Sequence, residues 1–497
     1  MQADALRARL EGAGLLVSWP AGAPRVIPSV TTDSRKVKPG ALFLAYPGTA
    51  VDGHGFVAAA ARAGAGFALV ERAVPDARIP QAVVRDGRRA ASVAASAFFG
   101  NPGDALVLLA VTGTNGKTTT VHLLRHLFSD RAPAGSLGTL GVTDARGHLL
   151  PTEGSLTTPG PVELYAALAA LRHGGAQTVA MEASSHSIDQ DRIGGLEFQA
   201  AVFTNLTRDH LDYHHDEASY LAAKVKLDRY LAPGGFQVVN ADDPAWRALP
   251  VRAERITFGT GAGADVRAEA VEGDRAGMRF RLAWRGATAD VALPLLGGFN
   301  VENALGAAAT AIALGRELGQ VAARLSAAPQ VPGRMERIAE TPCVVLRDYA
   351  HTPDALERAL TALRPLTSGR LLVVFGAGGD RDRGKRPMMG AVVAARADLG
   401  IVTSDNPRTE DPERILDDIE EGMGSTPHVR IVDRRAAILR ALAIARPDDT
   451  ILLAGKGHET YQVVGHDHVP LDERAIVAEA VGAAAGASPA PAAEAKA

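Results

Sequence analysis

Short apolar runs separated by helical stretches recur along most of this 497-residue chain. In the first hundred residues the runs are brief and the spacers are rich in alanine, until the turn Asn101-Pro102-Gly103 interrupts the pattern. A longer apolar run then opens onto a glycine-rich turn, as a buried strand would. Apolar runs that alternate with helical spacers are typical of parallel sheets with crossover helices, so the pattern predicts an α/β fold. The runs assigned to strands in this half are 41–46, 66–71, 82–86, 105–113, 178–182, 200–206 and 236–244.

The pattern changes twice more toward the C-terminus. Residues 264–294 alternate apolar and polar side chains around a Gly-Asp turn and predict a small antiparallel ribbon. An alanine-rich helix is expected at 301–315, with Asn300 as its N-cap. Near Pro332-Gly333-Arg334 a new series of buried-strand runs begins, at 343–351, 370–379, 399–407 and 449–457.

These changes predict three domains and a tail. We expect an N-terminal α/β domain at 1–103, a central parallel-sheet domain at 104–333 and a C-terminal Rossmann-like domain at 334–481. Residues 482–497 are of low complexity, rich in alanine, and are expected to be disordered.

Composition places the chain among ordinary globular proteins and excludes several classes of function. It is 46% hydrophobic, and 53 basic against 56 acidic residues leave a net charge of −3, so no basic excess marks a nucleic-acid binder. The one cysteine, Cys343, excludes an internal disulfide and cysteine-based zinc sites. No apolar run approaches the roughly 20 residues of a membrane span, and Asp4 and Glu11 interrupt the N-terminus where a signal peptide would be basic and then apolar. We therefore expect a cytoplasmic protein that binds neither membrane nor nucleic acid.

Lysine is rare, since only 8 of the 53 basic residues are lysine. Lys117 nevertheless lies in the glycine-rich turn 112–119 (TGTNGKTT), between a predicted strand and a predicted helix. Glycines let backbone N–H groups close on phosphate oxygens, and the helix N-terminus adds partial positive charge. Lys117 would then reach the β- and γ-phosphates and the Thr118 hydroxyl would bind Mg²⁺. Val111 stands where the general P-loop pattern has its first glycine, so this is a variant of that loop.

The segment TGTNGKTT resembles the ATP loop of the Mur ligases and of their relative folylpolyglutamate synthase. These enzymes use ATP to join an amino acid to a carboxylate through an acyl phosphate, and the loop alone does not choose among them. The resemblance implies that the central domain binds ATP and Mg²⁺, and we expect the chain to act as a monomer. By position it implies ATP contacts at Thr112, Gly113, Thr114, Asn115, Gly116, Lys117, Thr118, Asn303, Arg334, Asp348 and His351.

The expected metal site uses residues outside the loop as well. Glu182 ends the predicted strand 178–182, and a carboxylate there faces the ligand crevice of a parallel sheet. The resemblance makes Glu182, Thr118 and His210 the Mg²⁺ ligands. The alternative for the segment around His210 is a zinc cluster, weakened by its crowding into one short loop, formed by His210, Asp212, His214 and His215.

Lys224 lies in the segment SYLAAK on a probable helix. It matches the family's carbamylated lysine (N6-carboxylysine), which helps to position Mg²⁺. Carbamylation needs a neutral amine, which burial near other cations favours. The neighbouring Lys226 fits a solvated helix lysine. With Lys117, Glu182 and His210, Lys224 completes the expected catalytic group.

The resemblance also implies a site for a nucleotide-sugar peptide, UDP-MurNAc-L-Ala-D-Glu. The segment 31–43 resembles the uridine-nucleotide segment of the tripeptide-forming Mur ligases, although physically it is only a polar turn followed by a strand. Leu156 replaces an asparagine that is frequent in the family, which puts that contact in doubt. The implied positions are Thr32, Ser34, Thr49, Ala50, Val51, Leu156, Thr157, Thr158, Ser184, Gln190 and Arg192.

The segment DNPR, 405–408, follows a predicted strand at the edge where α/β sheets bind ligands. An Asn-Pro turn is its simplest structural interpretation. Among Mur ligases, however, it resembles the signature of enzymes that add meso-diaminopimelate rather than lysine. Diaminopimelate has a carboxylate that lysine lacks, which Arg408 can bind in a two-pronged contact, while Asp405 and Asn406 suit an ammonium. The implied positions are Arg381, Asp405, Asn406, Pro407, Arg408, Gly455 and Glu459.

Together these segments predict an ATP-dependent ligase that adds meso-diaminopimelate to the D-glutamate of UDP-MurNAc-L-Ala-D-Glu in peptidoglycan precursor synthesis. A lysine-adding ligase is the nearest alternative, and DNPR argues against it. Folylpolyglutamate synthase is disfavoured by the uridine-like segment. A P-loop ATPase that moves or regulates a partner is disfavoured by the variant loop and by the DNPR segment.

Overall fold

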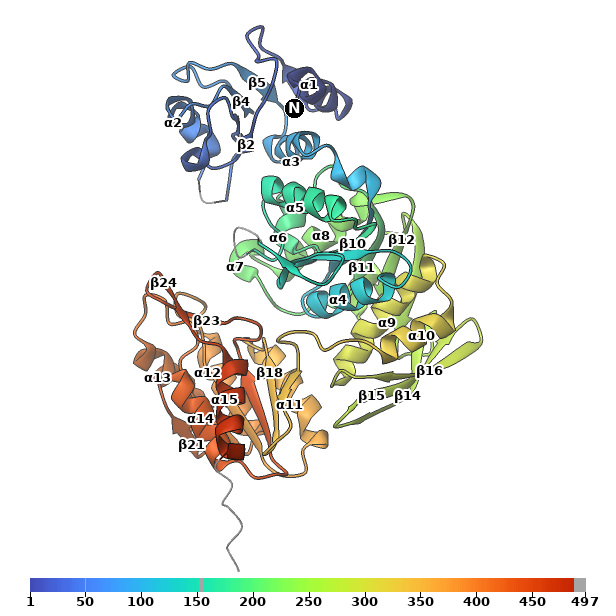
Figure 1. The fold of residues 1–497 in the computed structure, drawn as a ribbon, viewed down its shortest axis with the longest axis vertical. Helices are drawn as coiled ribbons and strands as arrows, with labels where there is room; N and C mark the ends of the chain where they lie inside the picture. Colours follow the sequence, from blue (N-terminus) through green and yellow to red (C-terminus); the bar gives the residue numbers. More distant parts are fainter. Residues whose placement is uncertain (50, 152–155, 487–497) are drawn as a thin grey trace, which may run out of the picture. The chain divides into compact units, whose positions relative to one another are not determined.

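The computed structural model describes residues 1–49, 51–151 and 156–486. Its elements form the expected α/β fold, built on three sheets and a small hairpin (Figure 1). Backbone contacts group the chain into two units: the first contains Met1–Glu269, Arg281–Val291 and Glu302–Leu325, and the second contains Ala270–Phe280, Ala292–Val301 and the chain from Ser326 onward. The N-terminal sheet and most of the central sheet thus belong to one unit, and the boundary predicted at 103 falls in a short 3₁₀ helix, η3.

The first sheet has the strand order β1-β5-β4-β3-β2 and is parallel except for the pair β1 and β5. Apolar residues of α1 and α3 pack on one of its faces, and those of α2 pack on the other. Strands buried on both faces read as continuous apolar runs, which explains the pattern of the first hundred residues. The elements are α1 (Ala3–Gly12), β1 (Leu16–Ser18), β2 (Val30–Thr31), η1 (Ser34–Lys36), β3 (Leu42–Leu44), η2 (Gly53–Phe56), α2 (Val57–Arg62), β4 (Phe67–Val70), β5 (Gln81–Val84) and α3 (Gly87–Phe98).

The second sheet has the order β16-β15-β14-β13-β12-β11-β6-β10-β7-β8-β9. Strands β11, β6, β10 and β7 are parallel neighbours, so the loops that follow them leave from the same edge. Helix α4 buries the predicted apolar residues Val121, Leu124, Leu127 and Phe128. The elements are η3 (Pro102–Ala105), β6 (Val107–Thr112), α4 (Lys117–Phe128), β7 (Ala134–Gly138), β8 (Gly141–Thr143), β9 (Leu149–Leu150), α5 (Pro161–His173), β10 (Thr178–Glu182), α6 (Ser185–Asp189), β11 (Phe198–Phe203), α7 (Leu211–His214), α8 (Glu217–Val225), η4 (Lys226–Tyr230), β12 (Leu231–Asn240), η5 (Pro244–Ala248) and β13 (Glu254–Gly259).

The ribbon predicted at 264–294 extends this sheet as β14 (Val266–Asp274), β15 (Gly277–Trp284) and β16 (Ala287–Leu293), followed by α9 (Gly298–Ala313) and α10 (Leu318–Ser326). The prediction that Asn300 is an N-cap is wrong, because α9 already begins at Gly298. Gly297, with φ of 93°, turns the chain earlier, and the Asn300 side chain donates to the Leu296 carbonyl at 2.8 Å.

The third sheet has the order β17-β18-β22-β19-β20-β21, with only β17 antiparallel. Along β19, Leu371, Val373 and Phe375 face α11, α12 and α13, whereas Leu372 and Val374 pack with α14 and α15. The elements are β17 (Glu336–Ala339), β18 (Val344–Asp348), α11 (Pro353–Leu363), η6 (Arg364–Leu366), β19 (Leu371–Phe375), α12 (Lys385–Arg396), β20 (Leu399–Val402), α13 (Pro412–Met423), β21 (His428–Arg430), α14 (Arg434–Ile444), β22 (Thr450–Ala454), the hairpin strands β23 (Tyr461–Val464) and β24 (Asp467–Pro470), and α15 (Glu473–Gly486).

Helix α15 continues to Gly486 and so overlaps the first five residues of the tail predicted from 482. The apolar side chains Ile476 and Val477 bury the helix against the third sheet, and this packing lies outside what the local composition indicates. The remainder of that predicted tail, 487–497, lies outside the described residues.

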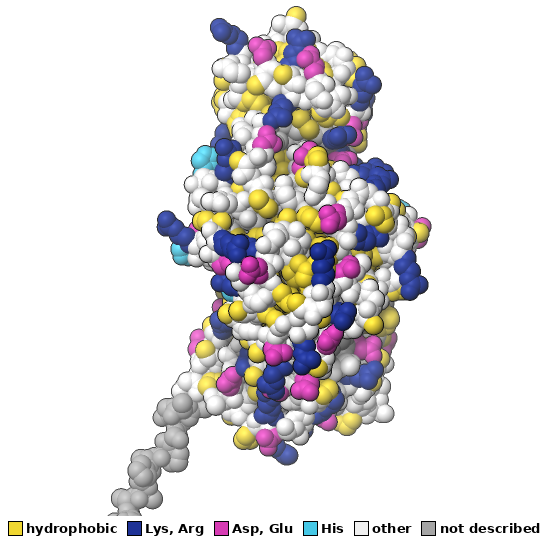
Figure 2. All heavy atoms as spheres, turned by 90° about the vertical axis from the view of Figure 1, so that its right-hand side faces the viewer, with side chains coloured by type: hydrophobic (Ala, Val, Ile, Leu, Met, Phe, Trp, Pro, Cys, Tyr) yellow, Lys and Arg dark blue, Asp and Glu magenta, His cyan; other side chains and the backbone are white. Residues whose placement is uncertain are grey.

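The surface carries both signs of charge. On the face that Figure 2 shows, basic and acidic side chains are interspersed rather than gathered into one field. Within the described part of the chain, every helix is too short or too polar to cross a bilayer.

An ion pair buried in the second unit ties α14 to α15. The side chains of Arg434 and Glu473 are both 0% exposed, 2.7 Å apart, and Arg434 also donates to the Ala454 carbonyl at the end of β22. The pair thereby fixes the strand end from which the loop 455–459 departs.

We expect Arg434→Met to lower the free energy of unfolding by about 3–5 kcal/mol, because the Glu473 carboxylate is then left buried without its partner. Chemical denaturation of the purified variant measures this. The double variant Arg434→Met/Glu473→Met should be more stable than the single one, and equal losses in both would contradict the ion-pair explanation.

Candidate active site

The phosphate loop joins β6 to α4 and is held by the segment that follows β11. The Asn205 carbonyl accepts from the Thr114 N–H at 2.7 Å, and its side-chain oxygen accepts from the Asn115 N–H at 2.9 Å. The Thr204 hydroxyl donates to the Asn115 carbonyl at 2.7 Å. These hydrogen bonds therefore join the loops that follow the adjacent strands β6 and β11.

At two positions of this loop the surrounding atoms leave room only for glycine. Gly113 has a φ of 143°, and a Cβ there would lie 1.9 Å from the Thr204 hydroxyl oxygen. Gly116 has a φ of 85°, and a Cβ there would lie 2.1 Å from Asn303 Oδ1. Asn303, predicted from sequence to contact adenine, thus lies directly against the phosphate loop.

Two lysines converge on one carbonyl of the loop. Lys117 donates to the carbonyls of Gly113 and Thr114 at 3.0 and 2.8 Å, and Lys224 donates to the Gly113 carbonyl at 2.7 Å. Lys224 is 1% exposed, and its Nζ lies 4.4 Å from the centre of the Tyr220 ring. Burial and the nearby Lys117 ammonium hold the pKa of Lys224 well below its usual value. Lys224 is therefore no solvated helix lysine, and its environment favours the neutral amine.

Glu182 lies buried at the end of β10. Its Oε1 accepts from the Thr139 N–H at 2.8 Å, and its Oε2 accepts from the Thr139 hydroxyl at 3.1 Å. The same hydroxyl lies 3.3 Å from Thr157 Oγ1. Thr139, which follows β7, therefore orients the carboxylate and connects it to the next group of predicted residues.

Four residues predicted for the nucleotide-sugar peptide form a connected group beside Glu182. The Thr158 hydroxyl donates to the Glu182 carbonyl at 2.7 Å and accepts from the Ser184 N–H at 3.2 Å. Arg192 donates to the Thr158 carbonyl at 2.9 Å and, through Nε and Nη2, to Gln190 Oε1 at 3.1 and 2.7 Å. The structure therefore brings Thr158 to Ser184, Gln190 and Arg192, which lie at the two ends of α6.

Arg192 also reaches the N-terminal sheet. Burial raises the pKa of Tyr46, and the positive charge of Arg192 opposes that rise, so the two side chains are neighbours. Tyr46 directly precedes the loop 47–52, which is closed by a bridge between Pro47 and Asp52.

The other residues predicted to contact the nucleotide-sugar peptide lie on different segments. Thr49 and Val51 lie in the loop 47–52, whereas Thr32 and Ser34 lie on the turn that enters η1. Leu156 is exposed. Ala50 lies outside the described residues.

His210 lies at the start of α7, with a left-handed φ of 53°, within a group of aromatic rings. Its ring centre is 4.9 Å from that of His186 and 6.1 Å from that of Tyr220. Among the residues whose side chains are described, no three His, Cys, Asp or Glu are arranged to hold a metal ion. The zinc alternative also includes Asp212, whose side chain lies outside that description, so it stays untested. Lys226, expected in solvent, forms an ion pair of 2.6 Å with Asp189 and is part-exposed.

In the second unit the parallel strands β18, β22, β19 and β20 end at one edge, and the loop after β22 meets the loop after β20 there. Lys456 is 0% exposed, and its ammonium donates to Asn406 Oδ1 at 2.7 Å and Glu459 Oε2 at 2.6 Å. It also lies 3.6 Å from Asp405 Oδ1. A Cβ at Gly455 would lie 2.8 Å from Asp405 Oδ2, so the absence of a side chain there lets the two loops come into contact.

Two predicted arginines lie beside this group. Arg408 Nη1 donates to the Gly379 carbonyl at 2.8 Å, and Arg381 Nη1 donates to the Asp380 carbonyl at 3.1 Å. The backbone of Arg408 is left-handed, with φ of 53°, and is held by the hairpin strand β23, where the Val463 carbonyl accepts from its N–H.

The residues predicted to contact ATP from the third domain also belong to the second unit. Asp348 is half-buried, desolvation raises its pKa, and its Oδ2 accepts from the Met335 N–H at 2.6 Å. The Arg334 guanidinium lies 4.8 Å from the Tyr349 ring centre, and His351 Nδ1 lies 2.7 Å from the Tyr349 carbonyl. Their contact with the nucleotide stays a prediction, since the phosphate loop belongs to the other unit.

Comparison with known proteins accounts for nearly the whole chain. The Mur ligase middle domain matches residues 111–311, the Mur ligase glutamate ligase domain matches 333–457, and the Mur ligase family catalytic domain matches 26–99. The chain is 45% identical over 467 residues to the UDP-N-acetylmuramoyl-L-alanyl-D-glutamate–2,6-diaminopimelate ligase of Gloeobacter violaceus, covering 92% of this chain and 94% of that protein. This chain belongs to the Mur ligase family.

Solved structures agree with this membership. A structure of a UDP-N-acetylmuramoyl-L-alanyl-D-glutamate–2,6-diaminopimelate ligase is 33% identical, with a TM-score of 0.66, and the match covers 95% of this chain and 99% of that one. MurF from Acinetobacter baumannii, 22% identical, has the same fold with a TM-score of 0.66 over 97% of this chain and 98% of that one. The sequence-based recognition of a three-domain Mur ligase fold is confirmed.

The structure adds residues to this Mur ligase site that sequence reasoning missed. Lys456 was available as one of the eight lysines and adjoins the predicted Gly455, but nothing local shows that its ammonium is buried between two loops. Thr139 and Asn205 carry no pattern of their own and gain their roles only from the strands that they follow.

We expect Gly116→Ala to weaken nucleotide binding, because its Cβ displaces Asn303 from the loop. Gly175→Ala is a matched control, since Gly175 has a similar φ of 88° with nothing within 4 Å. Both should lose about 1–2 kcal/mol of stability from the left-handed backbone. Displacement of a fluorescent ATP analogue should distinguish them, and equal affinities in the two variants would contradict this account.

Proposed function

We propose that this Mur ligase uses ATP to join meso-diaminopimelate to the D-glutamate of UDP-MurNAc-L-Ala-D-Glu. The observation that carries the proposal is the charge pattern at the edge of the third sheet. Asp405 and Glu459 share one ammonium, that of Lys456, which leaves a net negative charge for a substrate ammonium. Arg381 and Arg408 lie beside them, and their guanidinium groups donate to the carbonyls of Asp380 and Gly379. Their positive charge can bind a substrate carboxylate. The names of the relatives support the same substrate.

The first unit supplies the nucleotide half of the reaction. The loop 112–118, closed around Gly113 and Gly116, suits phosphate oxygens, and Asn303, which lies against Gly116, would contact the bound nucleotide. Mg²⁺ prefers one or two carboxylates together with phosphate oxygens, which fits the single buried carboxylate of Glu182 better than an all-protein cage. Thr118, Glu182 and His210 would hold the ion, which supplies charge neutralisation at the phosphates when bound.

The chain's own groups act mainly by positioning and by neutralising charge. Thr158, Ser184, Gln190 and Arg192 orient the nucleotide-sugar peptide so that its D-glutamate carboxylate attacks the γ-phosphate, releasing ADP and leaving an acyl phosphate. Lys117 neutralises charge on the transferred group. The free amine of diaminopimelate then adds to the acyl carbon, loses a proton and expels phosphate from the tetrahedral intermediate.

Lys224 is carbamylated in the active enzyme. Its neutral Nζ adds to the carbon of CO₂, an N–C bond forms, and one proton leaves to water. The lowered pKa of Lys224 supplies the neutral amine, and the resulting anion lies beside the Lys117 ammonium. The carbamate thereby replaces a neutral amine with an anion that pairs with the Lys117 ammonium.

The nucleotide-sugar substrate and ATP place the reaction in the cytoplasm, where we expect the chain to act as a monomer. The lysine-adding ligase remains the alternative to test, because lysine has the same amine and lacks only the distal carboxylate that Arg381 and Arg408 would bind.

We expect Lys224→Ala to fold but to be inactive, because the anion beside Lys117 is lost. A short-chain carboxylic acid added to the assay should restore part of the activity by occupying the vacated space. Phosphate release with and without formate measures this, with Lys226→Ala as the control that keeps its activity. Full activity of Lys224→Ala without acid would show that the residue is only a packing lysine.

An amino-acid panel tests the function itself. Phosphate release with UDP-MurNAc-L-Ala-D-Glu should require an amine substrate, and meso-diaminopimelate should be preferred over lysine by about 10³ or more, because the site's charged groups stay unpaired with lysine. Arg408→Ala should raise the KM for diaminopimelate by the equivalent of about 2–4 kcal/mol. The KM for ATP should stay unchanged.

Two results would overturn the assignment. One is equal use of lysine and diaminopimelate by the wild type. The other is an Arg408→Ala variant whose KM for diaminopimelate does not change.

A further inference from the structure

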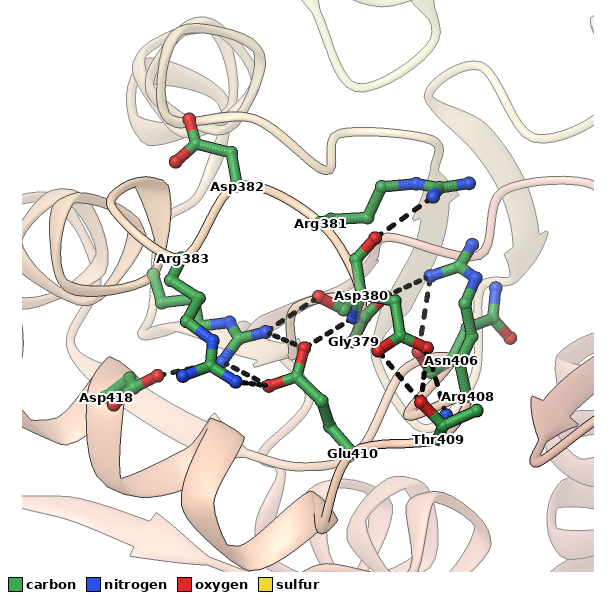
Figure 3. Close-up of polar contacts among 12 residues, drawn as sticks. Gly379, Asp380, Arg381, Asp382, Arg383, Asn406, Arg408, Thr409, Glu410 and Asp418 are labelled. Atoms are coloured by element: carbon green, nitrogen blue, oxygen red, sulfur yellow. Dashed lines mark hydrogen bonds and ion pairs between the residues drawn. The ribbon is translucent and has the colours of Figure 1, made fainter. Parts of the chain in front are cut away.

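Two loops of the second unit meet beside the predicted amino-acid site, one between β19 and α12 and the other between β20 and α13 (Figure 3). They are in backbone contact, since the Gly379 N–H donates to the Asn406 carbonyl at 2.9 Å. A Cβ at Gly379 would lie 1.9 Å from the Pro407 carbonyl oxygen. The first loop carries Arg381 and the second carries Arg408, so the spacing of these arginines depends on this contact.

One peptide group anchors Arg408. Its guanidinium donates to the Gly379 carbonyl, and the N–H on the other side of that peptide bond is the N–H of Asp380. The peptide bond is planar, so its carbonyl and its N–H turn together. The acceptor that fixes the Asp380 N–H therefore also fixes the carbonyl that holds Arg408, and the next carbonyl, that of Asp380, holds Arg381.

That acceptor is Glu410. Its Oε1 accepts from the Asp380 N–H and from Arg386 Nη2 at 2.9 Å, and its Oε2 accepts from Arg386 Nη1 and from Arg383 at 3.1 Å each. The Arg386 side chain is 1% exposed. Hydrogen bonds from Arg386 lower the pKa of Glu410 to about 2, so the carboxylate is ionised at neutral pH.

The backbone at Asp380 needs such support. Its φ of 52° is left-handed, a conformation that costs a residue with a side chain about 1–3 kcal/mol and persists only where neighbours enforce it. Thr409 provides a second restraint, donating from its N–H and its hydroxyl to the Asp380 carboxylate at 2.9–3.1 Å. Figure 3 shows these contacts surrounding the Gly379-Asp380 segment.

We propose that Glu410, seated on the buried Arg386, is a positioning residue for substrate specificity: it orients the Gly379-Asp380 peptide group and so places Arg408 and Arg381 to receive a substrate carboxylate. This inference rests on the proposed function. Glu410 touches neither substrate nor reacting atoms and acts through the two arginines.

A purely stabilising ion pair is the competing explanation, and the structure provides a matched control for it. Asp418, on α13, accepts from Arg386 Nη1 at 2.8 Å. Asp418→Asn therefore removes an ionic partner from the same arginine while leaving the bond between Glu410 and the Asp380 N–H in place. A general loss of stability would affect both variants, whereas a positioning role would affect only the Glu410 variant.

The experiment compares full-length wild type, Glu410→Met, Glu410→Ala and Asp418→Asn in steady-state phosphate release, with meso-diaminopimelate and with lysine. The methionine variant keeps the length of the side chain but removes the oxygen that accepts from the Asp380 N–H, so it provides the test if the alanine variant does not fold. We expect Glu410→Met to raise the KM for diaminopimelate by about 10- to 100-fold, as a displacement on the order of 1 Å does elsewhere. The KM values for ATP and for the nucleotide-sugar peptide should stay within about twofold.

The diaminopimelate-to-lysine ratio of kcat/KM is the readout that a merely structural role would not move. It should fall in both Glu410 variants, because lysine has no distal carboxylate to lose, and stay at the wild-type value in Asp418→Asn. An unchanged KM for diaminopimelate in Glu410→Met, or equal effects in Glu410→Met and Asp418→Asn, would overturn the inference. A wild type that does not use meso-diaminopimelate would instead contradict the proposed function.

Discussion

The carbonyl oxygen of Gly113 receives two lysine side chains, and the first unit is organised around that contact. Lys117 comes from α4, while Lys224 comes from α8, more than a hundred residues later. Burial and the nearby Lys117 ammonium lower the pKa of Lys224, because two ammonium groups on one acceptor repel strongly where water is excluded. A Cβ at Gly113 would clash with Thr204, so the glycine lets the segment after β11 pack against the phosphate loop.

In the second unit, one lysine ammonium lies between two carboxylates that would otherwise repel each other. Asp405 and Glu459 stand close together at the ends of two parallel strands, and the Lys456 ammonium between them removes most of their repulsion. Asn406 accepts from the same ammonium, so one buried cation fixes three side chains that face the site. The residual negative charge and the adjacent arginines together match the two ends of a zwitterion.

Both sites lie at the carboxyl edge of parallel strands, where backbone groups are free of the ladder and loops can be shaped. The shaping costs conformational energy, paid at left-handed residues such as His210, Asp380 and Arg408. Asp380 is held by Thr409 and Glu410 from the loop after β20, and Arg408 is held by the carbonyls of Val463 and Gly379. The geometry of the sites therefore depends on which strands are neighbours. A substitution in one loop should displace the side chains that are hydrogen-bonded to it from the adjacent loop.

The sequence alone determined the apolar strand runs, the helix after the phosphate loop, the family and the segments that carry its chemistry, because these depend on local periodicity and on short motifs. It failed where a decision depended on the path of the backbone: Asn300 is not a cap because Gly297 turns the chain before it. Only the tertiary structure decided that Lys224 is buried beside Lys117, that Lys456 lies between two loops, and that Glu410 holds the Asp380 N–H. These relations connect residues that are far apart in the chain, through burial, charge repulsion or a shared peptide plane. A local sequence pattern therefore cannot indicate them.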